Sequence, residues 1–252
     1  MAYPKGLLGV YAGGDYCFIL RSSVNSWPNK LGRAVSEFVY DILIEPGRRE
    51  FFKRAVLQMT VDRMRAHIPE TMLKDAQAAG LIQSGIEAIT WDQAFDAVHN
   101  ACDWLRFIFS SSPSWIGYDD TFCFSSDAQF GYFLDLDNLR LECWRGLRAV
   151  VPETPLFQRD HPFGQETQPM ARAFALDFGV ILHARGDHDR VVEIMEGHYR
   201  AFDKNLRTGT VRPFDPLLLI GPSLEEAMGI VYPGGDMTRP LGRFKVKSGL
   251  FR

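Results

Sequence analysis

Two adjacent serines lie where the sequence passes from an apolar strand into an amphipathic helix. Ser22 and Ser23 follow the apolar segment 16–20, and Pro28 stands near the first turn of the helix. A hydroxyl at such a junction is held by rigid elements, and backbone N–H groups at the helix start can stabilise an oxyanion. Ser22 and Ser23 are therefore candidate nucleophiles for acyl transfer. The alternative is structural, because serine and asparagine are also preferred cap and turn residues.

A cluster of cations follows in the next predicted helix, about residues 48–66. Its polar side carries six lysine or arginine residues against two acids, Glu50 and Asp62. Contacts between such residues and nucleic-acid phosphates are driven by charge and depend on salt, so an RNA partner is one interpretation. An ordinary solvated helix face is the other. The six cations are Arg48, Arg49, Lys53, Arg54, Arg63 and Arg65.

Two histidines and two aspartates stand close together at 183–189 and invite a metal interpretation. However, His183 is expected to end a strand and His188 to open a helix. Asp187 and Asp189 also fit a helix N-terminus, where negative charge is favoured by about 0.3–1 kcal/mol. The sequence therefore predicts no metal site.

Further acids and a histidine support a third chemistry, a small-molecule hydrolase or transferase. Paired carboxylates can perform acid–base catalysis, although β-turns are also where aspartate normally collects. A histidine beside carboxylates can act as a base, and His161 or His183 would fill that role. The acids concerned are Asp119, Asp120, Asp135, Asp137, Asp160 and Glu166.

The elements that must position these residues are hairpins and amphipathic helices. Segments 6–11 and 15–21 predict a hairpin, and 121–125, 130–135 and 139–144 predict an antiparallel meander. A first helix is expected after Ser26, which can cap it. Further helices are expected at 48–66, 70–79, 90–109 and 188–206. A strand is expected at 174–183 and an edge strand at 243–247. Because hairpins outnumber strand–helix–strand units, we predict an α+β fold, a mostly antiparallel sheet packed against amphipathic helices, in a single domain over 1–252.

Composition narrows the class of protein. Of 252 residues, 46% are hydrophobic and 23% charged, and the net charge of −3 argues against a DNA-coating protein. The apolar runs are too short for a signal peptide core or a membrane span. The four cysteines are interpreted as reduced, packed thiols. A cytoplasmic location is therefore expected. The phosphate-loop and dinucleotide fingerprints are missing from the sequence, and no cofactor is predicted.

The sequence contains a strand, then Ser22-x-x-Asn25-Ser26-Trp27, then an amphipathic helix. This arrangement resembles the nucleophile region of tRNA-dependent cyclodipeptide synthases. The resemblance implies that Ser22 takes an aminoacyl group from charged tRNA and that a diketopiperazine forms from the acyl-enzyme. Asn25, Ser26 and Trp27 would line the pocket, and the six cations would bind aminoacyl-tRNA. Glu153, in a Glu-x-Pro sequence, would be catalytic.

The chain also departs from that family. Ala149 stands where the family has a tyrosine, and Leu20-Arg21 precedes the serine where the family has a glycine. The resemblance implies a parallel sheet, whereas the residue patterns predict hairpins. Segments 25–32 and 133–137 are similar to a group of filamentous-fungal proteins, which implies a fungal source but no activity. A non-catalytic interaction domain with an exposed apolar patch is therefore the alternative function.

Overall fold

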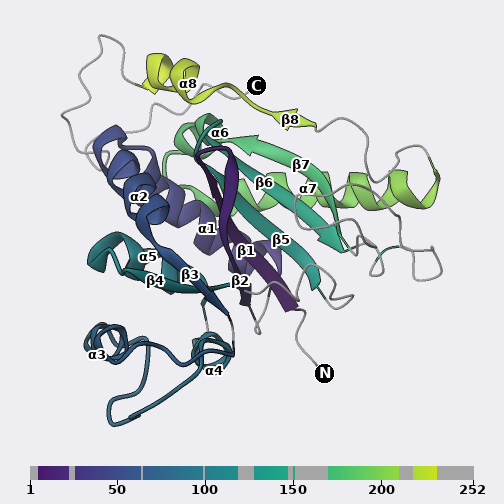
Figure 1. The fold of residues 1–252 in the computed structure, drawn as a ribbon. Coiled ribbons are helices and arrows are strands. Elements are labelled where there is room, and N and C mark those ends of the chain that lie inside the picture. Colours follow the sequence, from purple (N-terminus) through teal and green to yellow (C-terminus); the bar gives the residue numbers. More distant parts are fainter. Residues whose placement is uncertain are drawn as a thin grey trace.

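The computed structural model describes residues 5–22, 26–63, 65–98, 100–118, 128–146, 150, 170–209 and 218–231. A six-stranded sheet lies at the centre, in the order β2-β1-β5-β6-β7-β8 (Figure 1). Three of its five pairings are antiparallel, while β1/β5 and β7/β8 are parallel. The strands are β1 (Lys5–Ala12), β2 (Asp15–Ser22), β5 (Ala128–Asp135), β6 (Arg140–Gly146), β7 (Met170–Asp177) and β8 (Leu219–Ile220). The predicted α+β fold with a mostly antiparallel sheet is thus confirmed.

The predicted first hairpin is present as β1 and β2. Its turn contains Gly13 at φ +65° and Gly14 at φ +86°. Positive φ at both positions is what a tight hairpin turn needs, and glycine adopts it without steric cost. The carboxylate of Asp137, in the β5–β6 turn, accepts both of their backbone N–H groups at 3.1 and 2.9 Å. The two hairpin turns are therefore tied to each other.

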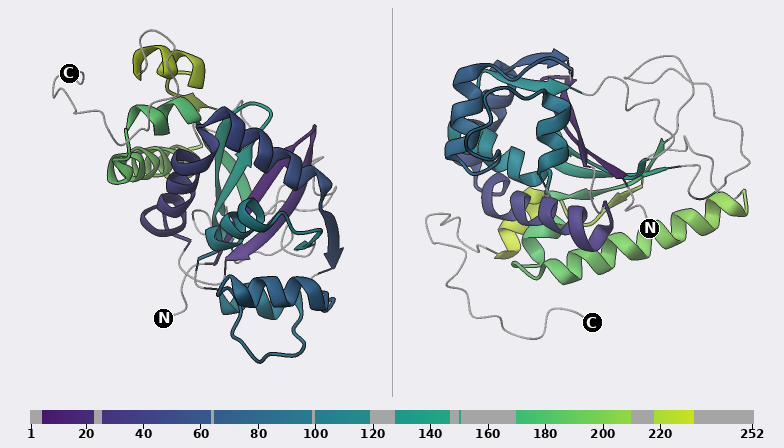
Figure 2. Two further views of the ribbon diagram at one scale, coloured as in Figure 1. Left: turned by 90° about the vertical axis from the view of Figure 1, so that its left-hand side faces the viewer. Right: turned by 90° about the horizontal axis from the view of Figure 1, so that it is seen from below.

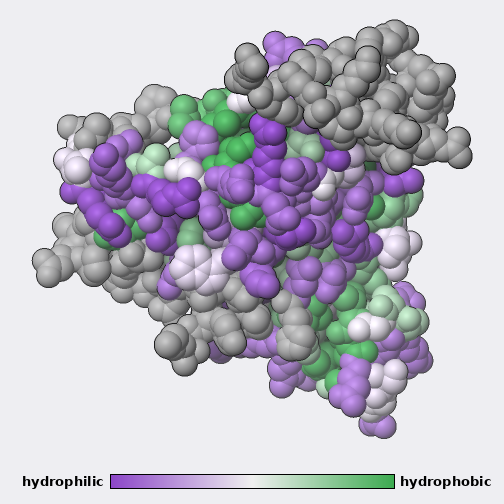
Figure 3. Space-filling view, turned by 180° about the vertical axis from the view of Figure 1, so that it is seen from behind, coloured by the Kyte–Doolittle hydropathy of each residue, from purple (hydrophilic) through white to green (hydrophobic). Residues whose placement is uncertain are grey.

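Helices cover one face of the sheet and one of its edges (Figures 1 and 2). The helical stretch predicted after Ser26 runs from residue 28 to 43 as η1 (Pro28–Gly32), α1 (Arg33–Phe38) and η2 (Val39–Leu43), and it packs against α7 (His188–Arg207). Beside them lie α6 (Phe178–His183) and α8 (Leu224–Val231), which contact each other. Seen from behind, this side of the molecule is mostly hydrophilic (Figure 3).

A second group of elements packs beside β2. It contains α2 (Pro46–Gln58), α3 (Glu70–Ala78), α4 (Trp91–Ala97) and α5 (Cys102–Ser111), with a small parallel sheet of β3 (Thr60–Arg63) and β4 (Trp115–Tyr118). Buried apolar side chains from Leu8 to Ala227 form one continuous cluster. A smaller cluster, which includes Leu7, Phe133 and Trp144, lies on the opposite face of the central sheet. The division of the whole chain into domains stays a prediction.

Three predicted elements are wrong in extent. The helix predicted at 48–66 ends at Gln58, because Thr60 and Val61 instead pair with β4 as a strand. The helix predicted at 90–109 is two helices, since Val98 is extended at φ −92°, ψ 122°. The strand predicted at 174–183 stops at Asp177, whose carboxylate caps α6. A continuous apolar run does not by itself distinguish a buried strand from a buried helix.

The remaining predicted elements have mixed outcomes. The helices predicted at 70–79 and 188–206 are present as α3 and α7, and Thr90 forms the expected capping box with Gln93. The predicted strands 121–125 and 243–247 lie outside the described residues. Among the described residues, no helix combines the length and the apolar character needed to span a lipid bilayer.

Candidate functional site

The predicted nucleophile Ser22 ends β2 on the face of the sheet that the helices cover. Its cross-strand partners form a row over four strands, Ser22–Gly6–Phe130–Arg145, hereafter the serine–arginine row. Three strand spacings of about 4.8 Å place the two ends of the row roughly 14 Å apart. Ser22 is only 4% exposed. A hydroxyl and a guanidinium are therefore held on one rigid surface.

Ser26 lies directly over Gly6 in this row. A Cβ atom added to Gly6 would come within 2.2 Å of the Ser26 Cβ, so only glycine leaves the space that Ser26 occupies. Ser26 is fully buried, and its carbonyl accepts the Tyr132 hydroxyl at 3.2 Å. It does not cap the following helix, which begins after Trp27 without a side-chain cap. The predicted cap role is wrong because packing over Gly6 takes the side chain into the sheet.

Trp27 continues the site toward solvent. Its side chain is 46% exposed, and its ring centroid lies 5.3 Å from that of Phe130. The Arg145 guanidinium stands 4.4 Å from the same Phe130 ring, within cation–π range. Tyr199 packs on Phe130 at 4.9 Å. The one exposed aromatic ring of this group is therefore Trp27, because Phe130 and Tyr199 are buried beneath it and beside Arg145.

Arg145 is anchored rather than free. Its Nε and Nη2 atoms each donate to a different oxygen of Asp203 on α7, at 3.0 Å, and its Nη1 donates to the Gln129 carbonyl at 2.9 Å. The Arg145 side chain is 10% exposed and that of Asp203 is 19% exposed. Such a two-bond geometry fixes the guanidinium in position.

The phenols beside the row are proton donors. Tyr132 and Tyr199 are buried, and burial raises both pKa values well above the usual range. The Tyr199 hydroxyl donates to the Trp144 carbonyl at 3.2 Å. Both phenols therefore stay protonated at neutral pH. A general base for Ser22 would have to come from elsewhere in the chain or from the substrate.

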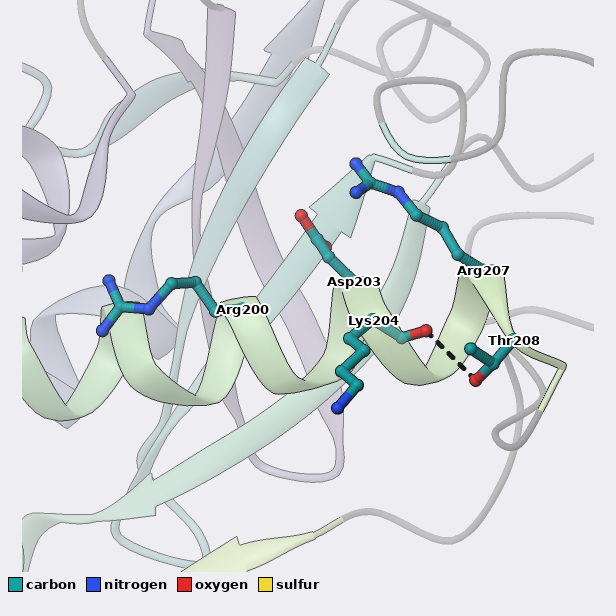
Figure 4. A pocket seen from close by; sticks show the side chains of 5 residues that line it. All are labelled: Arg200, Asp203, Lys204, Arg207 and Thr208. Carbon is teal, nitrogen blue, oxygen red and sulfur yellow. Dashed lines mark hydrogen bonds between the residues drawn. The ribbon is translucent and has the colours of Figure 1, made fainter.

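Asp203, which binds Arg145, also lines an open hollow of about 350 Å³ (Figure 4). The described residues that line it come from the last part of α7 and from Thr208, which caps the end of that helix. They share one side of the helix because their spacing is three, four, seven and eight residues. The α7 hollow is lined by Arg200, Asp203, Lys204, Arg207 and Thr208.

The six predicted tRNA-binding cations do not form one helix face. Arg49 donates to the Leu43 carbonyl at 3.0 Å, and burial lowers its pKa. Lys53 donates to Asp137 at 2.6 Å. The helix stops before the last two cations, so Arg63 lies in β3 and Arg65 in the turn after it.

The other cations of this group are more accessible. Arg48 is 57% exposed and donates to the Asp41 carbonyl at 2.9 Å, while Arg54 on α2 and Arg65 are exposed. The continuous basic helix is therefore wrong, and tRNA contact stays a prediction for the exposed members. The predicted site residues Ser23, Asn25 and Glu153 lie outside the described residues.

A serine–histidine contact that sequence reasoning missed joins α1 to α7. Ser36 Oγ lies 3.2 Å from His188 Nδ1, but it donates its proton to the Arg33 carbonyl at 2.8 Å. Which atom donates in the contact with His188 depends on the tautomer of the imidazole ring. The contact ties α1 to α7.

The alternative catalytic groups are dispersed or structural. His183 ends α6 while His188 opens α7, and within the described ranges no three metal-ligating side chains gather. Asp135 accepts three N–H groups in its own turn. Asp119, Asp120, Asp160, His161 and Glu166 lie outside the described residues.

A buried carboxylate on the other face of the sheet was also missed. Glu142 is 5% exposed and accepts the Trp144 indole N–H at 3.2 Å and Arg172 Nη1 at 2.8 Å. Burial, reinforced by the Glu142 charge, raises the pKa of nearby Tyr16 beyond its usual range. The alternation of Arg140, Glu142 and Trp144 along β6 is the period-two signal that places these side chains on one face.

Among the described residues, the most exposed large apolar side chains lie at the β8 edge of the sheet. Leu218, directly before β8, and Leu219, its first residue, are 55% and 52% exposed. Unpaired backbone groups and apolar side chains on an edge strand can pair with another chain. The interaction-domain alternative stays a prediction.

Comparison of this chain with protein-family models, curated proteins and solved structures gives no significant match. The resemblances to cyclodipeptide synthases and to fungal proteins therefore stay predictions that depend on the residues quoted for them.

Proposed function

We propose that this protein is an acyl-transfer enzyme that accepts aminoacyl groups from charged tRNA on Ser22 and joins two of them as a diketopiperazine. The observation that carries the proposal is the serine–arginine row. It holds Ser22 and Ser26 on the same face of the sheet as the buried ring of Phe130, which contacts the exposed Trp27 and the fixed Arg145 guanidinium. These are the groups that a nucleophile and an aminoacylated nucleotide require.

In the proposed reaction, Ser22 Oγ adds to the ester carbonyl of aminoacyl-tRNA. The ester C–O bond breaks, the ribose hydroxyl leaves with the serine proton, and an aminoacyl ester of Ser22 remains. The amine of a second aminoacyl-tRNA attacks this ester, and Ser22 recovers its proton. The free amine of the resulting dipeptidyl-tRNA then attacks its own ester, which closes the ring and releases the tRNA.

The burial of Ser22 supports this chemistry in one respect. Ser22 as a whole residue is only 4% exposed, so it is largely shielded from bulk water. A water-poor site protects an ester intermediate from hydrolysis and strengthens hydrogen bonds to a developing oxyanion. The exposed cations Arg48, Arg54 and Arg65 are the proposed contacts with tRNA phosphates.

The test is mass spectrometry of extracts from a bacterial host that expresses the chain, together with the intact mass of the purified protein. We expect a new diketopiperazine and an aminoacyl adduct on Ser22, and Ser22→Ala should abolish both. Ser36→Ala is the matched control, because Ser36 is also buried but its hydroxyl serves the Arg33 carbonyl. It should retain product.

The outcomes separate the alternatives. A diketopiperazine that persists in folded Ser22→Ala and disappears in Ser23→Ala would move the nucleophile by one residue. Failure of the wild-type chain to form product or adduct, even with purified aminoacyl-tRNA from a fungal source, would overturn the proposal. Circular dichroism of each variant excludes loss by unfolding.

A further inference from the structure

Ser22 lies at the end of an edge strand. It is the last residue of β2, which is the outermost strand on its side of the central sheet, and among the described residues β2 pairs only with β1. An edge strand has ladder hydrogen bonds on one side only, and the ends of an element open most easily. The position of the Ser22 hydroxyl therefore depends on what else holds this end of β2.

The preceding residue, Arg21, joins the strand end to helix α4. Its Nη2 donates to Asp92 Oδ1 at 2.9 Å and lies 3.2 Å from both carboxylate oxygens of Asp96. The two aspartates are four positions apart, so they share one side of α4. This helix contacts β2 and lies beside the end of that strand (Figure 1). The guanidinium is therefore a cross-link between β2 and α4.

Helix α4 is itself fixed to the core. Thr90 and Gln93 form its capping box, and Trp91 in its first turn is fully buried. A Cβ atom added to Gly117 of β4 would lie 2.5 Å from the Trp91 Cβ, so the helix packs closely on that strand. The ring of Trp91 also lies 6.0 Å from that of Trp104 on α5. The aspartates thus give Arg21 a rigid attachment.

Stability alone explains little of this arrangement. Asp92 and Asp96 are 46% and 47% exposed, and ion pairs at such exposure contribute little to the free energy of unfolding. Two like charges four positions apart on a helix also repel each other. What the contact adds is position, because two carboxylates that meet at one nitrogen fix where the guanidinium lies.

Arg21 acts on Ser22 through the strand and not through a substrate. Successive side chains of a strand point to opposite faces, and Leu7, the cross-strand partner of Arg21, belongs to the cluster on the face opposite Ser22. We propose that Arg21, held by Asp92 and Asp96, is a positioning residue that fixes Ser22 for acylation. This inference rests on the reaction proposed for Ser22.

The first test measures the rate at which the aminoacyl adduct forms on Ser22 over a range of aminoacyl-tRNA concentrations, by intact mass. Asp92→Asn/Asp96→Asn keeps the shape of both side chains and removes their charge. Its maximal rate should fall by about tenfold at an unchanged half-saturating concentration, because positioning affects the chemical step and not binding. Arg21→Gln should lose as much, and the triple variant should lose no more than either, since the three groups act as one unit.

Arg106→Gln is the matched control. Arg106 is 42% exposed and lies 3.3 Å from Asp41, so it is also an arginine in a half-exposed ion pair, but on α5. It should retain the wild-type rate. An equal fall in Arg106→Gln would overturn the proposal and assign the effect to general stability. A fall that appears only in the half-saturating concentration would overturn it as well.

A second test needs no turnover. Amide hydrogen exchange of the full chain should be about tenfold faster at Arg21 and Ser22 in Asp92→Asn/Asp96→Asn, and unchanged in β5. Equal exchange in the wild type and the variant would overturn the proposal whatever the rates are. Absence of any adduct in the wild type would instead refute the reaction proposed for Ser22, while the exchange data would still decide whether Arg21 holds the strand end.

Discussion

Helices α2 and α7 both carry several cations, but the fold uses these cations differently. On α2, Arg49 is directed to the carbonyls that end η2, and Lys53 holds the turn residue Asp137. On α7, Lys204 and Arg200 border an open hollow, and Asp203, the one acid among the described residues that line it, is bound by Arg145. The difference teaches that a count of cations along a helix says little about how many remain available to a ligand.

The largest expected effect concerns the Arg145–Asp203 ion pair beside the α7 hollow. Arg145→Ala removes the hydrogen bonds of the guanidinium to Asp203 and to the Gln129 carbonyl, and it leaves Asp203 partly buried without its partner. We expect a loss of about 2–4 kcal/mol in the free energy of unfolding, measured by urea titration. Arg145→Lys keeps the charge without the two-bond geometry and should recover less than half of the loss. A change below about 0.5 kcal/mol in Arg145→Ala would mean that the pair does not organise this end of α7.

A smaller effect is expected on α2. There, two alanine variants compare Arg49, which binds backbone carbonyls, with the exposed Arg54. Arg49→Ala removes donors to half-buried carbonyls and should cost about 1–2 kcal/mol of stability. Arg54 is exposed and lies five positions after Arg49. Arg54→Ala should therefore change the free energy of unfolding by less than about 0.5 kcal/mol. Chemical denaturation of the two variants side by side checks this. Equal losses would contradict the distinction between structural and free cations on α2.

The smallest effect is a pH dependence at the turn that Lys53 holds. Burial alone would raise the pKa of Asp137, but hydrogen bonds from Lys53, Gly14 and Gly13 outweigh it, and the pKa lies below its usual value. A lowered pKa contributes stability above the unfolded-state value, near 3.9, and this contribution is lost as pH falls through the folded-state value. Between pH 5 and 2, stability of the wild type should therefore fall more steeply than that of Asp137→Asn. Parallel curves would show that the turn does not depend on the ionised carboxylate.

Local sequence patterns correctly predicted a turn and two helix caps. The Gly13-Gly14 turn, the capping box at Thr90 and the Asp187 cap of α7 are all present because each depends on neighbours in the sequence. The errors arose where tertiary pairing competes with a local pattern. Thr60 and Val61 continue a cationic helix in the sequence, but hydrogen bonds to β4 make them a strand.

The candidate site was only partly visible in the sequence. The position of Ser22 at the end of a strand and of Trp27 at the start of a helix followed from period and turn chemistry. The partners of these residues did not, because Phe130 and Arg145 are more than a hundred positions away and reach the row through strand register. No local signal places Ser26 over Gly6 either, since this depends on the absence of a Cβ in another strand.

By itself, the sequence determined the α+β class, the first hairpin and the helical layer, because apolar period and turn residues act over a few neighbouring positions. Only the tertiary structure decided which charges remain available. Arg49 and Lys53 are used by carbonyls and acids that other segments bring to them, whereas Arg200 and Lys204 are left beside a hollow. The physical reason is that hydrogen bonds and ion pairs are satisfied by whichever partner lies within about 3 Å, and that distance is set by the fold.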